Sequence, residues 1–207
     1  MKKLKVAVFA SGRGSNFASI LDAITSNRLH VSIELLLTNN PEAGALSIAK
    51  ESKIPGIVIS RGSFESREDF LDTMLSALSN HGIEMIVLAG YMKKIPPEVV
   101  SQYSNRILNI HPALLPSFGG KGMFGHYVHE AVLETGCKVT GVTVHIVDEV
   151  YDRGPIVAQS CVPVHDDDTA ETLAARVLRT EHRLYPEVLQ LFAEGRVQVE
   201  GRKVTIK

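Results

Sequence analysis

The sequence predicts an α/β protein in which a mostly parallel, twisted sheet carries helices on both faces, with an antiparallel ribbon in the C-terminal half. Apolar runs of strand length alternate with segments of helical period through the first half of the chain. Glycine, proline or polar residues follow most of these runs and mark loops. After about residue 122, two β-rich runs follow each other closely. We therefore expect a Rossmann-like first half and a ribbon after it.

The first half is expected to contain five strands and four helices. The strands are predicted over residues 5–10, 31–37, 56–59, 84–89 and 107–110, and the helices over 17–24, 42–52, 63–78 and 97–102. In the third helix Phe64, Phe70, Leu71 and Met74 recur at helical spacing. The run 84–89 is apolar nearly throughout, which is typical of a central strand.

The second half should begin with a helix over 126–134 that Gly136 ends. The ribbon is predicted over 139–147 and 156–164. A long helix then opens at Asp168, which is expected to cap it, and a hairpin over 198–206 ends the chain. All 207 residues fit one domain, with halves 1–110 and 111–207.

Composition excludes several classes of protein. The formal net charge is −1, so no basic field points to nucleic acid, and no apolar run reaches the length of a membrane helix. Cys137 and Cys161 match no metal spacing, and two inert thiols are favoured over a pair on neighbouring strands. Lys5 and the following glycine turn favour a first strand over a signal peptide, so a cytoplasmic protein is expected.

A glycine-rich loop leads from the first strand into the first helix. Its residues are Gly12, Arg13, Gly14, Ser15 and Asn16. Free backbone N–H groups and the helix dipole make such a loop an anion site. Phe17 stands where a dinucleotide fingerprint needs a third glycine, and the Lys-Ser/Thr of a nucleotide P-loop is missing. A monophosphate on a small substrate fits better. The alternative is a tight turn with a helix cap.

The run 109–116 ends the fifth strand with Asn109 and His111, followed by two prolines. Side chains two residues apart on a strand share one face, so an amide and an imidazole should meet at one spot, suited to an oxygen that becomes negative during a reaction. The alternative is a structural histidine. The acidic loop 148–155 supplies carboxylates, and one beside His111 would raise its pKa. Because the glycine loop, the Gly90 loop and this run all follow strands, we expect them to share a cleft.

Two further features have open interpretations. Glu181 falls on the apolar stripe of the last helix, where it needs a partner such as Arg176 or His182, or else binds sugar hydroxyls. His126 and His129 are spaced like a metal pair, but no third ligand is near in sequence, so a helix surface is favoured and no metal is expected.

Five motifs together resemble one enzyme family from about Lys5 to Val204. They are Ser11-Gly-Arg-Gly-Ser-Asn16, Leu88-Ala-Gly-Tyr-Met92, Asn109-Ile-His-Pro-Ala-Leu-Leu-Pro116, Val142-Thr-Val-His145 and Asp152-Arg-Gly-Pro155. They are similar to those of the phosphoribosylglycinamide formyltransferases, which use 10-formyltetrahydrofolate. The resemblance implies the formyltransferase fold. It also implies a phosphate-binding first half and a second half with the folate loop.

The resemblance also implies roles for individual residues. Asn109, His111 and Asp152 match the catalytic trio, Gly12 to Asn16 would hold the substrate phosphate, and Glu181 would bind the ribose. Folate contacts are implied for Arg67, Met92, Lys93, Lys94, Ile95, Asn109, Asp148, Glu149, Val150, Tyr151 and Asp152.

The implied reaction moves a formyl group from 10-formyltetrahydrofolate to the amine of 5′-phosphoribosylglycinamide in de novo purine biosynthesis. It implies small-molecule substrates, no metal, and a cytoplasmic monomer or homodimer. Two alternatives share the Asn-x-His core: a tRNA formyltransferase and a formyltetrahydrofolate hydrolase. Each normally adds a domain that 207 residues do not accommodate. A third alternative, of another class, is a non-catalytic module that binds a phosphometabolite.

Overall fold

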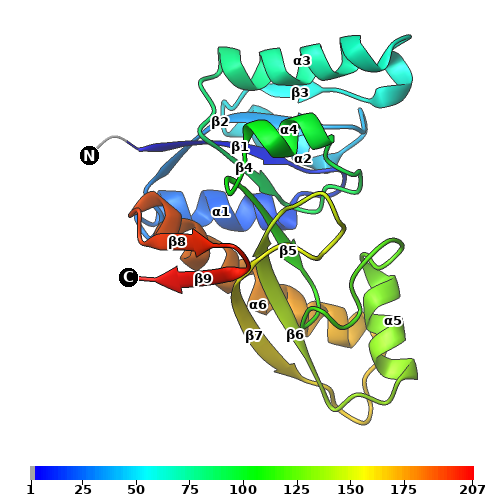
Figure 1. Ribbon diagram of the computed structural model, residues 1–207. Helices are drawn as coiled ribbons and strands as arrows, with labels where there is room; N and C mark the ends of the chain where they lie inside the picture. The colour runs from blue at the N-terminus through cyan, green and yellow to red at the C-terminus, as the bar shows by residue number, and fades with distance from the viewer. Residues whose placement is uncertain (1–2) are drawn as a thin grey trace. The chain divides into compact units, whose positions relative to one another are not determined.

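The computed structural model describes residues 3–207, and the chain divides into two compact units (Figure 1). The first ends at Leu108 and the second runs from Asn109 to Lys207. This boundary lies two residues before the division at residue 110 that the sequence predicts. Within residues 3–207, seven strands belong to the main sheet, and two more form a separate ribbon.

The first unit alternates strands and helices as predicted. Its elements are β1 (Leu4–Phe9), α1 (Ser15–Thr25), β2 (Val31–Thr38), α2 (Gly44–Glu51), β3 (Gly56–Val58), the 3₁₀ helix η1 (Arg61–Ser63), α3 (Arg67–Asn80), β4 (Met85–Leu88) and α4 (Pro97–Gln102). Its strands lie in the order β3-β2-β1-β4, and the pairs β1–β2, β1–β4 and β2–β3 are parallel.

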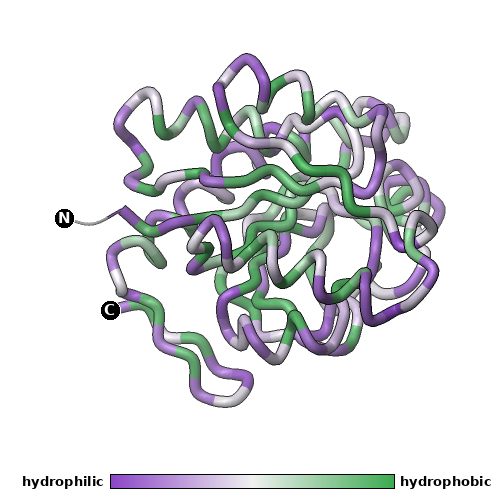
Figure 2. The backbone as a smooth tube through the Cα atoms, turned by 90° about the horizontal axis from the view of Figure 1, so that it is seen from above, coloured by the Kyte–Doolittle hydropathy of each residue, from purple (hydrophilic) through white to green (hydrophobic). Residues whose placement is uncertain are grey.

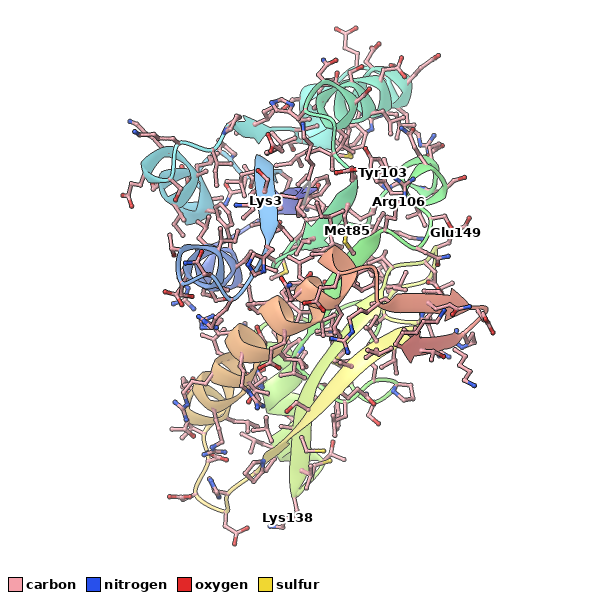
Figure 3. The ribbon with its side chains drawn as sticks, turned by 90° about the vertical axis from the view of Figure 1, so that its left-hand side faces the viewer. Lys3, Met85, Tyr103, Arg106, Lys138 and Glu149 are labelled. Atoms are coloured by element: carbon pink, nitrogen blue, oxygen red, sulfur yellow. The ribbon has the colours of Figure 1, made fainter. Side chains whose placement is uncertain are left out.

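Strand β4 is central, as its composition predicts. It pairs with β1 on one side, and the Ile86 N–H donates to the Arg106 carbonyl on the other at 2.9 Å. All its residues are buried, which is worth roughly 1.5–3 kcal/mol for each large apolar side chain. On the neighbouring connection, the Arg106 guanidinium lies 5.1 Å from the centre of the Tyr103 ring (Figure 3).

The start of α3 differs from the prediction. The helix begins at Arg67, and Ser66 caps it by accepting a hydrogen bond from the Asp69 N–H at 2.9 Å. Phe64 lies before the helix and packs edge-on against Phe70, with ring centres 5.8 Å apart. Phe64 thus lies outside the helix and packs back onto its first turn. The apolar periodicity alone does not distinguish such a position from one within the helix.

The second unit contains the predicted antiparallel ribbon. It contains the last three residues of β5 (Ile107–His111). Its other elements are α5 (His126–Glu134), β6 (Val139–Ile146), β7 (Ile156–Pro163), α6 (Ala170–Ala193), β8 (Val197–Glu200) and β9 (Lys203–Ile206). β6 and β7 pair antiparallel, and α6 packs on both of them and on α5 (Figure 1). Hydrophobic and hydrophilic residues alternate along the β8–β9 hairpin (Figure 2).

Two sequence predictions are wrong in detail in this unit. Thr169, and not Asp168, caps α6, through reciprocal hydrogen bonds with Thr172. Asp168 instead accepts two hydrogen bonds from Arg176, at 2.6 and 2.7 Å, and one from the His165 N–H. His129 is buried on α5 and only 4% exposed, so the prediction of two surface histidines holds for His126 alone.

Cys137 and Cys161 are both free. Over residues 3–207, no helix combines the length and the apolar character that crossing a membrane requires.

The carboxylate of Asp168 should be a large contributor to the stability of the second unit. Its side chain is 2% exposed, and the Arg176 hydrogen bonds hold its pKa well below the usual range. We expect Asp168→Ala to lower the free energy of unfolding by about 2 kcal/mol at neutral pH. Because the pKa is depressed in the folded protein, this contribution should be lost as the pH falls below about 3.9.

Urea unfolding at pH 7 and pH 3 measures this contribution. Asp166→Ala is the matched control, because Asp166 forms an ion pair with Lys138 but is 89% exposed. Equal effects of the two substitutions at pH 7 would contradict the assignment.

Candidate active site

Asp152 is the centre of a polar cluster in the second unit. Its side chain is only 11% exposed. Oδ2 lies 3.8 Å from His111 Nδ1, and Oδ1 lies 3.6 Å from His145 Nε2. Oδ2 also accepts a hydrogen bond from the Gly120 N–H at 2.8 Å. The structure thus brings Asp152 and His111 together, and adds His145 to them.

The turn after β6 fixes the place of Asp152. Asp148 Oδ1 accepts a hydrogen bond from the Val150 N–H at 2.8 Å, which closes the turn locally. Asp152 itself has φ +53°, in the left-handed region that aspartate tolerates better than most residues. Burial favours the neutral carboxyl, but the hydrogen bond from the Gly120 N–H and the neighbouring His145 and His111 rings outweigh it, so the pKa of Asp152 is lowered. The carboxylate is therefore ionised at neutral pH.

His111 has a defined ring proton. Its Nε2 lies 2.8 Å from the Phe118 carbonyl, which can only accept, so Nε2 carries the proton and Nδ1 faces Asp152. Burial lowers the pKa of His111, and the opposing effects of Asp152 and the Phe118 carbonyl do not offset it. The carboxylate raises the pKa of His111 as the sequence predicts, but the net shift is downward, because desolvation of a ring that is 5% exposed exceeds the attraction of a carboxylate at 3.8 Å.

His145 is a site residue to which sequence reasoning gave no role. Asn109 Nδ2 donates to its Nε2 at 3.1 Å, while its Nδ1 donates to the Ile146 carbonyl at 2.9 Å. The ring therefore orients the Asn109 amide and contacts Asp152 on the same edge. The signal available in the sequence was the alternation of Thr143 and His145, which places both on one face of β6.

Thr143 holds the segment that follows His111. Its hydroxyl donates to the Ala113 carbonyl at 2.7 Å and accepts from the Leu115 N–H at 3.0 Å. Gln159 on β7 donates to the Leu115 carbonyl at 2.9 Å. The ribbon β6–β7 thus supports this segment as well as the cluster of polar side chains.

The glycine loop in the first unit has the geometry of an anion site. Gly14 precedes α1 with φ +83°, and a Cβ there would meet the Ala45 Cα and Cβ at 3.0 Å. Only glycine satisfies both constraints. Gly14 takes the N-cap position, and no side chain caps the first turn of α1. α1 begins at Ser15, directly after this glycine, and the positive end of its dipole favours an anion there.

Ser11 joins this loop to the loop after β4. Its hydroxyl lies 2.5 Å from Asn39 Oδ1 and accepts a hydrogen bond from the Met92 N–H at 2.8 Å, while its own N–H donates to the Gly90 carbonyl at 3.0 Å. Tyr91 packs edge-on against Phe9, and burial raises its pKa to about 12. Ser11 belongs to the glycine-loop motif in the sequence, but its link to the loop after β4 was not predicted.

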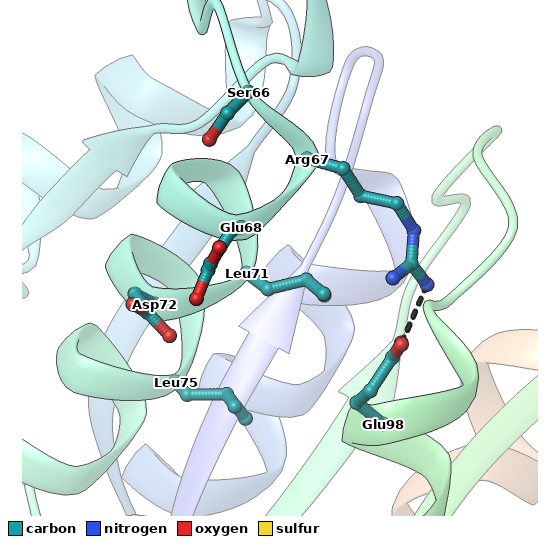
Figure 4. A pocket seen from close by; sticks show the side chains of 7 residues that line it. All are labelled: Ser66, Arg67, Glu68, Leu71, Asp72, Leu75 and Glu98. Atoms are coloured by element: carbon teal, nitrogen blue, oxygen red, sulfur yellow. Dashed lines mark hydrogen bonds and ion pairs between the residues drawn. The ribbon is translucent and has the colours of Figure 1, made fainter.

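The residues predicted to contact folate fall into two groups. In the first unit, Arg67 forms an ion pair with Glu98 at 2.7 Å across a groove of about 530 Å³ between α3 and α4 (Figure 4). Met92, Lys93 and Lys94 are exposed in the loop after β4, and Ile95 is buried. In the second unit, Glu149, Val150 and Tyr151 are exposed in the turn after β6.

Glu181 lies on the buried face of α6 and is 8% exposed. Arg176, which the sequence offered as its partner, is instead engaged with Asp168. His182 has a buried Nε2 without a hydrogen-bond partner, and burial lowers its pKa. Within residues 3–207, no group of three or more His, Cys, Asp or Glu side chains is placed to hold a metal ion.

Comparisons with known proteins show the family to which the chain belongs. The model of the formyl transferase family matches residues 4–189. A chloroplastic phosphoribosylglycinamide formyltransferase of Vigna unguiculata is 44% identical over 95% of the chain, and the chain spans 63% of that relative's length. The phosphoribosylglycinamide formyltransferase of Bacillus subtilis (strain 168) is 38% identical over 90% of the chain and 93% of the relative.

A solved structure of a similar protein has the same fold. The crystal structure of glycinamide ribonucleotide transformylase 1 from Symbiobacterium toebii has a TM-score of 0.92 to this chain at 37% identity, covering 99% of this chain and 94% of that one. The predicted fold class is thereby confirmed.

Buried histidines should make the protein less stable in acid. Burial lowers the pKa of His111, His129 and His182, so below about pH 6.5 the unfolded chain binds more protons than the folded one. Stability should therefore be complete above pH 6.5 and fall as the pH drops below it. His129→Leu should reduce the loss between pH 7.5 and 5.5, because the Nδ1 atom of His129 is buried without a partner.

Urea unfolding of both forms at the two pH values measures the effect. His126→Leu, an exposed position on the same helix, is the control. A loss of stability in His129→Leu as large as in the unsubstituted protein would contradict the interpretation.

Proposed function

Because the chain belongs to the formyl transferase family, and within it to the phosphoribosylglycinamide formyltransferases, we propose that it transfers the formyl group of 10-formyltetrahydrofolate to the amine of 5′-phosphoribosylglycinamide. This reaction is a step of de novo purine biosynthesis. The observation that supports it most directly is the ionised Asp152 facing the unprotonated Nδ1 of a neutral His111. That arrangement suits a reaction in which one proton must leave an amine and reach another nitrogen.

In the proposed reaction His111 accepts one proton and gives it up again. The substrate amine attacks the formyl carbon, a C–N bond forms, and the carbonyl oxygen becomes an oxyanion. His111 takes the amine proton and becomes an imidazolium, which Asp152 stabilises at 3.8 Å. When the bond between the formyl carbon and N10 breaks, the proton passes to N10. The products are the N-formyl ribonucleotide and tetrahydrofolate, and His111 is neutral again.

Asn109 is proposed to stabilise the oxyanion. His145 accepts one N–H of its amide at 3.1 Å, which fixes the plane of the amide and leaves the second N–H for the reacting oxygen. A donor that is already oriented before the reaction needs no reorganisation as the charge develops. Such a donor typically lowers the activation free energy by about 2.7–4 kcal/mol.

The proposed substrate contacts are made by the glycine loop and by Glu181. The loop from Gly12 to Asn16 binds the phosphate, supported by the uncapped first turn of α1 and the left-handed Gly14. Arg13, exposed in this loop, adds a positive charge. Glu181, a carboxylate on the buried face of α6, accepts hydrogen bonds from the ribose hydroxyls in this proposal.

Folate contacts are proposed for the exposed side chains of the two predicted groups. Arg67 can release Glu98 to bind a folate carboxylate, because their ion pair is more than 40% exposed on each side and hence weak. Met92, Val150 and Tyr151 offer exposed apolar surface for the pterin and benzoyl rings. Ile95 is buried, so its contribution is to anchor its loop. Lys93, Lys94, Asp148 and Glu149 complete the proposed contacts.

The proposed cellular setting follows from the composition. We place the protein in the cytoplasm, as a monomer or homodimer that acts on small molecules without nucleic acid or a membrane surface. A net charge of −1 and two free cysteines support this setting.

Substitutions at the catalytic trio test the proposal. With 5′-phosphoribosylglycinamide and 10-formyltetrahydrofolate, Asn109→Ala and His111→Ala should each lower kcat by about 100-fold or more, since each removes a group that acts in the transition state. Release of tetrahydrofolate measures the rate. Asn80→Ala, an exposed position at the end of α3, is the control and should keep full activity.

The same assay separates the alternatives. Tetrahydrofolate release without the ribonucleotide would indicate a hydrolase, and release only with aminoacylated initiator tRNA would indicate a tRNA formyltransferase. Binding of both substrates without turnover would indicate a non-catalytic module. Each of these results would overturn the proposed function.

A further inference from the structure

Residues 118–120 bridge the two reactive side chains of the second unit through their backbone. We propose that this segment is a positioning element: the Phe118 carbonyl keeps the proton of neutral His111 on Nε2, and the Gly120 N–H keeps Asp152 opposite Nδ1. The inference rests on the proposed function, because it assigns Nδ1 as the atom that accepts the amine proton.

Two hydrogen-bond acceptors flank the imidazole of His111. A neutral ring has a single N–H, but the Phe118 carbonyl flanks Nε2 at 2.8 Å and Asp152 flanks Nδ1 at 3.8 Å. An ionised carboxylate is normally the stronger acceptor, so it would draw the proton to Nδ1 if it were free to approach. At 3.8 Å it is too far for a hydrogen bond, whereas the carbonyl is at an ideal distance.

Gly120 explains why Asp152 does not approach. Its N–H donates to Asp152 Oδ2 at 2.8 Å, and Oδ2 is the same oxygen that faces Nδ1. The other oxygen, Oδ1, faces His145. The oxygen that faces His111 is therefore held by Gly120, and the carboxylate stays within range to stabilise a charge on the ring without taking its proton.

The course of the segment depends on close packing at Gly119. A Cβ there would overlap the Leu115 Cδ2 atom and lie 3.2 Å from the Asp152 Cβ. On either side, Phe118 has φ +54° and Gly120 φ +100°, so both neighbours lie in the left-handed region. A bulky residue such as phenylalanine adopts this conformation only where its surroundings impose it. A side chain at position 119 should thus displace the carbonyl and the N–H together.

His111 therefore has a free lone pair on Nδ1, the atom that accepts the amine proton in the proposed reaction. The amine proton passes to Nδ1, which gives an imidazolium with Nε2–H on the Phe118 carbonyl and Nδ1–H beside Asp152. The same proton leaves Nδ1 for N10 when the C–N10 bond breaks. A ring with its proton already on Nδ1 would have no lone pair there to begin the cycle.

The test reads the ring proton directly, with no substrate present. In protein labelled with ¹⁵N at histidine, two-bond ¹H–¹⁵N correlation spectra at pH 8 report the tautomer of His111, whose signals are assigned from their loss in His111→Gln. We expect the Nε2–H form in the unsubstituted protein. In Gly119→Ala the Nδ1–H form should gain at least a tenfold share, with a fall in kcat of at least tenfold. Lys121→Ala, exposed two residues on, should change neither.

Two results would overturn the inference. One is the Nδ1–H form in the unsubstituted protein, which needs no variant to be seen. The other is a folded Gly119→Ala variant that keeps both the Nε2–H form and full turnover. Because the spectra are independent of catalysis, a protein with the expected tautomer but no formyl transfer would count against the proposed function and not against the placement of the proton.

Discussion

The carboxylate of Asp152 between two imidazoles is the interaction on which the site in the second unit depends. It faces His111 at 3.8 Å and His145 at 3.6 Å, and His145 in turn orients Asn109. A buried carboxylate is costly unless hydrogen bonds and opposite charges compensate it. Here they do so fully enough to lower its pKa, and one of these groups, His111, belongs to the proposed catalytic trio. The contacts that offset the cost of burying this charge thus also position the side chain of Asp152 beside His111.

Much of this could be predicted from the sequence, because the signals were local. The period of apolar residues located strands and helices, and the spacing of Asn109 and His111 placed both at the end of β5. The glycine loop before α1 was equally visible, since a left-handed residue packed against Ala45 requires glycine at position 14. These features depend on residues close together in the chain.

The errors came from interactions between residues far apart in sequence. The sign of the His111 pKa shift required the depth of its burial, which no spacing reveals, and burial prevailed over a carboxylate that the sequence had correctly paired with it. The role of His145 required knowledge of its partners on other segments. The burial of His129 likewise depends on how α5 packs against α6. Even the cap of α6 moved by one residue, because Arg176 engages Asp168.

The pH dependence of kcat/KM for formyl transfer tests the central claim most directly. A neutral His111 that accepts a proton predicts an acid limb with its midpoint below the usual histidine value of about 6.5. Asp152→Asn should move this midpoint to lower pH, because the carboxylate raises the pKa of the ring, while a limb due to the substrate amine stays in place. An acid limb at or above pH 6.5, or one that Asp152→Asn leaves unmoved, would contradict the account.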